Sequence, residues 1–332
     1  MRFPRSRCSD LVAGGVAAAI VAAVPAGTAQ AQACCAGATA TTPGRLGLRD
    51  DALVGFLSRG NAIFGSFDES GRFAPSAPHA VEVDLEQDLF VSLRVLGRGQ
   101  LSILTPFLET RRLSRRIAEF GGGVGDLNVS GRYDFLLDGQ SRYFPGVALL
   151  AGVTFPTGVA PDNAFKPLAT DSTGTGVVQG NVGLALEQSA GDWLFDVSGL
   201  LAIRAPRSIH GVEENGVLQW TALGSVSWTV NPKWTAALSL SYVAEGDAVI
   251  DGRPIAQTGR RTPNISLSAG HALTKEWRLQ SGVFFNPPIP FLGQNQPASA
   301  GLSWTLLYGW PCNPDAHSFG GMLAGGKLRP GC

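Results

Sequence analysis

The stretch that decides the fold reads VEVDLEQDLFVSLRVL and runs from Val81 to Leu96. Apolar residues occupy most of one set of alternate positions, and most of the other set is charged or polar. Successive side chains of a β-strand point to opposite faces, so this period of two predicts a strand with one apolar face and one charged face. At ~3.3 Å per residue the strand would be ~50 Å long, which is more than soluble strands usually reach.

The same alternation of apolar and polar residues returns along the chain. Twelve segments show it, at about 52–67, 81–96, 101–109, 126–137, 144–155, 178–187, 192–204, 218–230, 233–245, 262–274, 277–285 and 299–310. The connections between them are alternately long and short, which gives six long loops and five short turns. Membrane barrels place short turns in the periplasm and long loops outside the cell. The sequence therefore predicts an all-β fold, a transmembrane antiparallel β-barrel of about twelve strands with both termini periplasmic.

Aromatic residues favour a membrane barrel over a soluble fold. Trp220 and Trp228 are eight residues apart on the apolar face of one segment, as are Trp234 and Tyr242 on the next. Eight residues span ~26 Å along a strand, which suits two bands of interfacial aromatic side chains. In the predicted phase all seven tryptophans face outward. A soluble β-sandwich or propeller also shows alternation, but it does not require a long loop at every second connection.

The N-terminus has the plan of a cleavable secretory signal. Three arginines within the first seven residues precede an apolar run from Leu11 to Val24, and residues 31–33 read AQA. As a helix this run would reach only ~21 Å, short of the ~30 Å hydrocarbon core of a bilayer. A retained membrane anchor and acylation of Cys34 are the alternatives. We expect a signal peptide at 1–33, a periplasmic segment at 34–51, an outer-membrane barrel at 52–310 that needs the barrel insertion machinery of a Gram-negative bacterium, and a C-terminal tail at 311–332.

Four cysteines remain after cleavage, Cys34, Cys35, Cys312 and Cys332. Disulfides persist in exported proteins, and four cysteines allow three pairings. A bridge between the adjacent Cys34 and Cys35 is strained, which favours two links between the N-terminal and C-terminal tails. We predict that the tails at 34–50 and 311–332 form a periplasmic plug or clasp.

The polar faces of the strands would line the interior of the barrel. Their charged residues either fill the barrel as an internal network of ion pairs or form a constriction that discriminates solutes by charge. The lumen-facing candidates are Glu82, Asp84, Glu86, Asp88, Arg94, Asp126, Arg132, Asp134, Asp192, Asp196 and Arg204, with Asn128 among their uncharged neighbours.

Other functions find little support in the sequence. Only 16% of residues are charged and the net charge is zero, so no basic field exists to attract nucleic acid. The four histidines are scattered without metal-ligand spacing, so we expect no metal and no cofactor. His271 falls on the outward face, which keeps open a hydrolase acting at the lipid face. No serine and orienting partner can be named beside it, so we expect no enzyme.

Short glycine-rich stretches in the middle of the chain carry a family resemblance. They are Gly123–Tyr133, Pro145–Gly158 and Gly174–Gly176, within about 120–205. This part of the chain resembles an outer-membrane transporter-like family associated with the meta-pathway of phenol degradation. The resemblance implies a barrel that admits small aromatic or apolar molecules, and it fixes no ligand-contact residue. Passage of small solutes across a lipid membrane is therefore the leading interpretation, and a structural or adhesive envelope barrel with a plugged lumen is the alternative.

Overall fold

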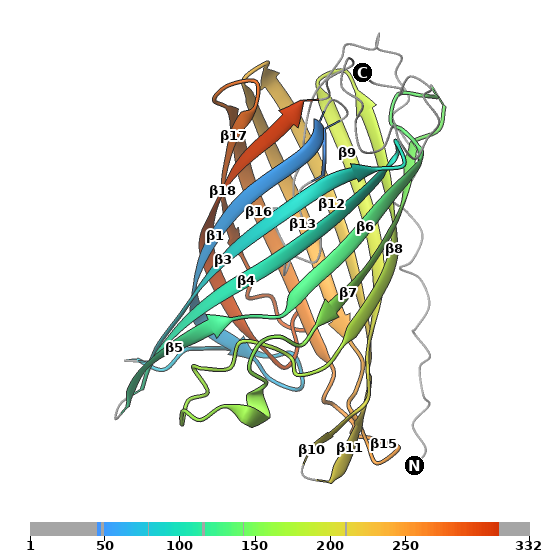
Figure 1. Ribbon diagram of the computed structural model, residues 1–332. Helices are drawn as coiled ribbons and strands as arrows, with labels where there is room; N and C mark the ends of the chain where they lie inside the picture. The colour runs from blue at the N-terminus through green and yellow to red at the C-terminus, as the bar shows by residue number, and fades with distance from the viewer. Residues whose placement is uncertain are drawn as a thin grey trace, which may run out of the picture.

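The computed structural model describes residues 45–47, 50–78, 80–114, 117–141, 143–209 and 211–311. Twelve of its strands form a closed antiparallel barrel, in which each strand pairs with the next and the last pairs with the first (Figure 1). These strands are β1 (Asp50–Phe67), β3 (Val81–Val95), β4 (Gly99–Leu113), β6 (Leu127–Leu136), β7 (Gly146–Phe155), β8 (Gln179–Ala190), β9 (Trp193–Arg204), β12 (Leu218–Asn231), β13 (Trp234–Glu245), β16 (Arg260–Ala272), β17 (Trp277–Phe285) and β18 (Gln296–Pro311). The predicted fold class is confirmed, and each of the twelve predicted segments coincides with one barrel strand.

The two ends of the barrel differ in the length of their connections. Five short turns lie at the end where Asp50 of β1 pairs with Pro311 of β18, which is at the top of Figure 1. We call this the short-turn end; outer-membrane barrels generally turn the end with the short turns toward the periplasm. Among the described residues, no helix is long and apolar enough to span a membrane.

Six longer connections lie at the other end, the loop end. They contain short elements: β2 (Phe73–Pro75), β5 (Ala118–Val124), the 3-10 helix η1 (Pro161–Asn163), β10 (Arg207–Ile209), β11 (Val212–Asn215), β14 (Val249–Ile250) and β15 (Arg253–Pro254). The last four pair into a small separate sheet at the bottom of Figure 1. This alternation of short and long connections is the one that the sequence predicts.

The barrel exposes its apolar side chains outward. On β3 the side chain of Leu89 is 56% exposed, whereas the neighbouring Phe90 is 4% exposed. All seven tryptophans are between 41% and 46% exposed, as predicted. Tryptophans near the short-turn end form cross-strand pairs, such as Trp193 stacked on Trp228 with ring centroids 5.8 Å apart. Such a surface suits contact with lipid, with an aromatic band at the membrane interface.

Candidate functional site

The interior face of the barrel is the candidate site, because it holds the polar half of each alternating strand. One wall of it consists of β12, β13 and β16. The residues that face inward at its centre are uncharged, and two thirds of them carry hydroxyl groups, namely Thr221, Ser225, Ser227, Thr229, Thr235, Ser239, Ser241, Thr262, Ser266 and Ser268; Leu223, Ala237, Val243, Asn264 and Gly270 lie between them. We call this surface the hydroxyl wall. Its position was not singled out as a site from the sequence, since serine on a polar strand face is no specific signal.

Several groups of the hydroxyl wall have no hydrogen-bond partner among the described residues. They are the Oγ atoms of Ser227, Ser241 and Ser266 and Oγ1 of Thr229, and Oδ1 of the neighbouring Asn264 on β16 is in the same situation. Ser227 is 1% exposed and Ser266 is 2% exposed. A buried polar group without a partner costs free energy unless water or a solute satisfies it. Because these atoms are buried, an enclosed water molecule or a rotation of the side chain must satisfy them.

The opposite wall, formed by β1, β3 and β4, carries paired charges. Glu82 of β3 forms an ion pair with Arg112 of β4 at 2.8 Å, and Glu86 of β3 forms one with Arg59 of β1. The guanidinium of Arg59 also lies 5.8 Å from the ring centroid of Phe284, a favourable cation–π contact. These pairs agree with an internal network of ions on this wall.

Asp88 differs from its charged neighbours on β3. Its side chain is fully buried, and both of its carboxylate oxygens are without a hydrogen-bond partner. The residues opposite it in the sheet are Leu57 on β1 and Pro106 on β4, which have no hydrogen to donate from their side chains. Asp84, four residues before, also has one carboxylate oxygen without a partner.

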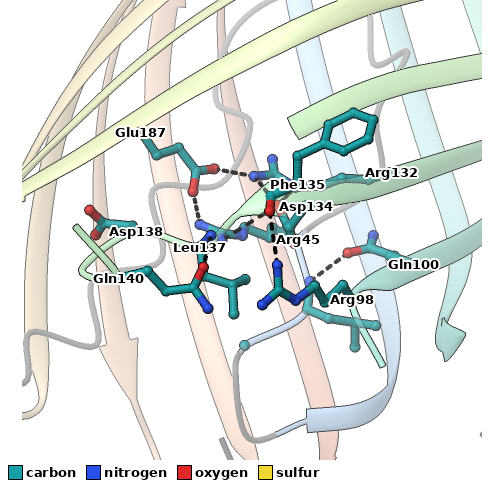
Figure 2. Close-up of polar contacts among 12 residues, drawn as sticks. Arg45, Arg98, Gln100, Arg132, Asp134, Phe135, Leu137, Asp138, Gln140 and Glu187 are labelled. Atoms are coloured by element: carbon teal, nitrogen blue, oxygen red, sulfur yellow. Dashed lines mark hydrogen bonds and ion pairs between the residues drawn. The ribbon is translucent and has the colours of Figure 1, made fainter. Parts of the chain in front are cut away.

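A second group of ions lies near the short-turn end, on β6 and β8 (Figure 2). Arg132 contacts Asp134 at 2.9 Å and Glu187 at 2.7 Å. Arg45, which precedes β1, forms an ion pair with Glu187 and reaches Asp134 at 3.9 Å. Asp196 on β9 is the cross-strand neighbour of Glu187. We call these five residues the mouth cluster.

Residues 45–47, which we call the N-terminal strap, lie inside the mouth at the short-turn end. The backbone N–H of Leu46 donates to Oε1 of Gln100 at 2.9 Å, and the Leu46 side chain is 4% exposed. It packs in an apolar cluster with Leu53, Phe90, Leu104 and Leu307. The strap thus contacts β1, β3, β4, β6, β8 and β18. A short segment reaches strands on so many sides only from within the barrel.

The first part of the chain is also held to the barrel by Arg94 of β3. Its Nε donates to the carbonyl oxygen of Asp50 at 2.9 Å, and its Nη2 donates to the carbonyl oxygen of Gly47. Arg94 is therefore an anchor for this segment. Its position on the polar face of β3 was predicted from the sequence, whereas its partner was not.

Two predicted lumen residues lie elsewhere. Asp192 is exposed in the short turn between β8 and β9. Asp126 lies in the connection between β5 and β6, where it accepts hydrogen bonds from the backbone N–H of Gly158 at 3.0 Å and of Thr175 at 2.6 Å. Both residues directly precede a strand, so the alternation that was used to assign their direction does not extend to them. The assignment of Asp126 and Asp192 to the lumen is corrected accordingly.

Asp126 belongs to a set of contacts that fix the loop 156–178 against the barrel. The Thr157 hydroxyl donates to the carbonyl oxygen of Gly125 at 2.7 Å, and the Thr173 hydroxyl donates to that of Val124 at 2.8 Å. Glu119 of β5 accepts hydrogen bonds from the Thr170 hydroxyl at 2.8 Å and from the Leu168 N–H at 3.1 Å. The stretches that carry the family resemblance are thus largely the ones that join this loop to the wall.

The remaining predictions have the following outcomes. Arg204 on β9 faces inward near the loop end and forms an ion pair with Glu245. Asn128 donates to the Thr154 hydroxyl oxygen at 2.9 Å. His271 packs on Trp234, with ring centroids 4.1 Å apart.

Among the described residues no group of three or more His, Cys, Asp or Glu side chains is placed to hold a metal ion. The four cysteines and the segments 34–44 and 312–332 lie outside the described residues.

Solved structures with the same architecture come from bacterial outer membranes. The chain is similar to the crystal structure of the COG4313 outer membrane channel from Pseudomonas putida F1, with a TM-score of 0.65 and 16% identity over 79% of this chain and 96% of that one. Similarity to the NanC porin is lower, with a TM-score of 0.44 and 14% identity over 77% of this chain and 99% of that one. Similarity to the translocator domain of the autotransporter NalP from Neisseria meningitidis has a TM-score of 0.46 and 10% identity over 78% of this chain and 88% of that one. No protein-family model and no curated protein matches the sequence. The chain has the fold of a bacterial outer-membrane barrel.

Proposed function

We propose that this protein is an outer-membrane channel through which small solutes pass. The observation that carries the proposal is the hydroxyl wall, an uncharged polar surface of serine and threonine side chains on β12, β13 and β16 that faces the interior. Hydroxyl groups donate and accept hydrogen bonds without carrying charge, so a wall of this kind suits water and small uncharged solutes in the interior. The COG4313 protein, which has a similar fold, is itself described as an outer membrane channel.

The interior also carries apolar groups, which bear on the kind of solute. One cluster contains Ala148 and Leu150 of β7, Ala185 of β8 and, packed against them, Leu200 of β9. Apolar side chains next to hydroxyl groups suit solutes that have an apolar body and a few polar atoms. The resemblance to the family associated with phenol degradation points to the same class. We therefore propose small aromatic or apolar solutes as cargo, without a catalytic step.

The N-terminal strap favours a second candidate function. Because Leu46 is buried in the short-turn mouth, the strap reduces the opening there. A barrel that stays closed in this way would be a structural or adhesive envelope protein, with its loops as contact surfaces. The two functions differ in whether an inserted barrel conducts.

Single-channel recording in a planar bilayer tests the proposal. The refolded barrel is expected to give steady conductance steps, and liposomes that contain it should swell faster in a small aromatic solute that crosses bilayers slowly, such as phenylalanine, than protein-free liposomes do, and faster than in a disaccharide of the same osmolarity. Insertion is verified separately by protection of the strands from protease. An inserted barrel that never conducts would support the structural role instead.

Export and assembly are proposals of the same kind. We propose that residues 1–33 are removed as a signal peptide and that the barrel insertion machinery inserts the chain into the outer membrane. N-terminal sequencing of the protein from outer-membrane fractions is expected to begin at Cys34. A start at Met1, or an acylated Cys34, would show retention or lipidation.

A further inference from the structure

The N-terminal strap seats a guanidinium group among carboxylates. Arg45 pairs with Glu187 and Asp134, and Arg132 contacts the same two carboxylates (Figure 2). Asp196 is the cross-strand neighbour of Glu187 in the sheet. The mouth cluster therefore contains three carboxylates and two guanidinium groups. One of these two groups, that of Arg45, is carried by the strap rather than by the barrel wall.

Departure of the strap would change the charge balance of this seat. Three carboxylates would then share the single guanidinium of Arg132. The side chains of Glu187 and Asp134 are only 6% and 12% exposed, so water screens them weakly. Removal of one partner from a buried ion pair is strongly unfavourable, because the other charge stays behind unpaired. The seat that Arg45 leaves is consequently built to take another cation.

Beside the carboxylates that hold the Arg45 guanidinium lies an apolar site. The next residue of the strap, Leu46, is buried among Leu53, Phe90, Leu104 and Leu307. These four side chains come from β1, β3, β4 and β18 and belong to the barrel wall. Without Leu46 they would form an apolar surface next to the three carboxylates. The strap thus fills two adjoining seats of different chemistry with two consecutive residues.

We propose that Arg45 and Leu46 act as a built-in ligand that occupies a solute-binding site of the barrel. The site takes a small amphipathic cation, with a guanidinium or ammonium group at Glu187, Asp134 and Asp196 and an apolar group in the seat of Leu46. Binding of such a solute displaces the strap, as a ligand shifts a two-state equilibrium toward the state that it prefers. The consequence that displacement opens the mouth rests on the proposed channel function, whereas the binding itself does not.

Chemical labelling of the strap tests the binding step without any reference to conduction. A Leu46→Cys variant is prepared with the native cysteines replaced by serine, since cysteine keeps much of the apolar character of the site. The refolded barrel in detergent is treated with a polyethylene-glycol maleimide, which is neutral. Butylguanidinium chloride is the probe, and butyramide and potassium chloride at equal concentration are the controls.

The proposal predicts slow labelling of the cysteine in the absence of the probe. Saturating butylguanidinium should accelerate labelling ~10-fold. This factor corresponds to a change of ~1.4 kcal/mol in the free energy that holds the strap in place. Butyramide lacks the charge and potassium chloride lacks the apolar group, so neither should have this effect. Labelling at the rate of a free thiol without the probe would overturn the proposal, and so would equal acceleration by either control.

Substitutions separate a specific seat from general electrostatics. In the Leu46→Cys background, Arg45→Ala should label fast without the probe, and Arg45→Lys should restore protection in part. Arg98→Ala is the matched control, because it removes an equal charge at the same end from a side chain that donates to the carbonyl oxygen of Phe135. Protection that is lost equally in Arg98→Ala and Arg45→Ala would contradict the assigned seat.

Bilayer recording then distinguishes the two proposals. A strap that responds to butylguanidinium in a barrel that never conducts would refute the channel and keep the binding site. If butylguanidinium changed neither the open probability of a conducting barrel nor the labelling rate of the Leu46→Cys variant, the binding site would be refuted and the channel would stand. Open probability that rises with butylguanidinium in the wild type but not in Arg45→Ala is the result that both proposals predict.

Discussion

Arg278 of β17 forms an ion pair with Asp50, the first residue of β1, and so crosses β18, the strand that closes the barrel. The two side chains are 22% and 11% exposed. The pair joins the two ends of the barrel sequence at the short-turn end. It therefore stabilises the seam where the first barrel strand pairs with the last. These two strands are farther apart in the sequence than any other pair of neighbouring barrel strands.

Substitution Asp50→Asn is expected to weaken this seam. The variant leaves the partly buried guanidinium of Arg278 without its carboxylate, which should lower the free energy of unfolding by about 1–2 kcal/mol. Urea unfolding in micelles, followed by tryptophan fluorescence, measures the change. Asp192→Asn, in an exposed turn at the same end, should have no measurable effect. Equal stability of Asp50→Asn and the wild type would show that the pair is dispensable.

Ion selectivity should follow the pairs on the charged wall. Glu86→Gln releases Arg59 from its carboxylate and adds one net positive charge to the interior. The reversal potential in a potassium chloride gradient is expected to move toward anion preference. Arg59→Gln should move it in the opposite direction. If the reversal potential were the same in the wild type and in both variants, this wall would lie outside the conduction path.

Two buried serines provide a matched test of the hydroxyl wall. The Ser227 hydroxyl has no partner among the described residues, whereas the Ser92 hydroxyl lies 2.8 Å from that of Ser102. Ser227→Ala should leave stability within ~0.5 kcal/mol, while Ser92→Ala should cost about 1 kcal/mol, because it leaves Ser102 with one partner fewer. Unfolding in denaturant compares the two. A larger loss in Ser227→Ala would show that its hydroxyl is bonded after all.

The loop between β1 and β2 should respond to acid. Hydrogen bonds from the Ser70 hydroxyl and from the backbone N–H of Arg72 lower the pKa of the exposed Asp68 from 3.8 to about 2. A carboxyl with a lowered pKa in the folded state stabilises the fold above its unfolded pKa and loses this effect as the pH falls through the folded value. The contribution of Asp68 should therefore be complete above pH ~4 and vanish below pH ~2.

Thermal unfolding of the wild type and of Asp68→Asn measures this contribution. The difference between them should shrink as the pH is lowered from 4 to 2. A carbon chemical-shift titration of the Asp68 carboxyl gives the pKa directly. A titration midpoint near 3.8 would show that the hydrogen bonds from Ser70 and Arg72 to the Asp68 carboxylate do not form.

The barrel was predictable because the membrane imposes a repeating demand on the sequence. Each strand needs an apolar residue at every second position, so Val81–Val95 shows its two faces without knowledge of any other strand. The lengths of the connections then give the two ends. Asp126 and Asp192 were misassigned where this alternation stops, one residue before a strand begins.

The partners of the interior side chains were not predictable in the same way. The alternation assigns Glu82 and Glu86 to one face, but their pairs with Arg112 and Arg59 depend on the register between strands, which the sequence does not show. The strap lies in the tail 34–50, which the sequence predicts to form a plug or clasp, but its contacts could not be assigned. Arg45 and Leu46 belong to no periodic pattern, and their seats come from six strands that meet only when the barrel closes.

Planar-bilayer recording of the refolded barrel, with insertion verified independently, tests the central claim most directly. The proposed channel predicts steady single-channel steps for the wild type and a higher open probability for Arg45→Ala, in which the strap loses its ion pairs. Silence from inserted wild type and inserted Arg45→Ala alike would contradict the channel and leave a structural barrel.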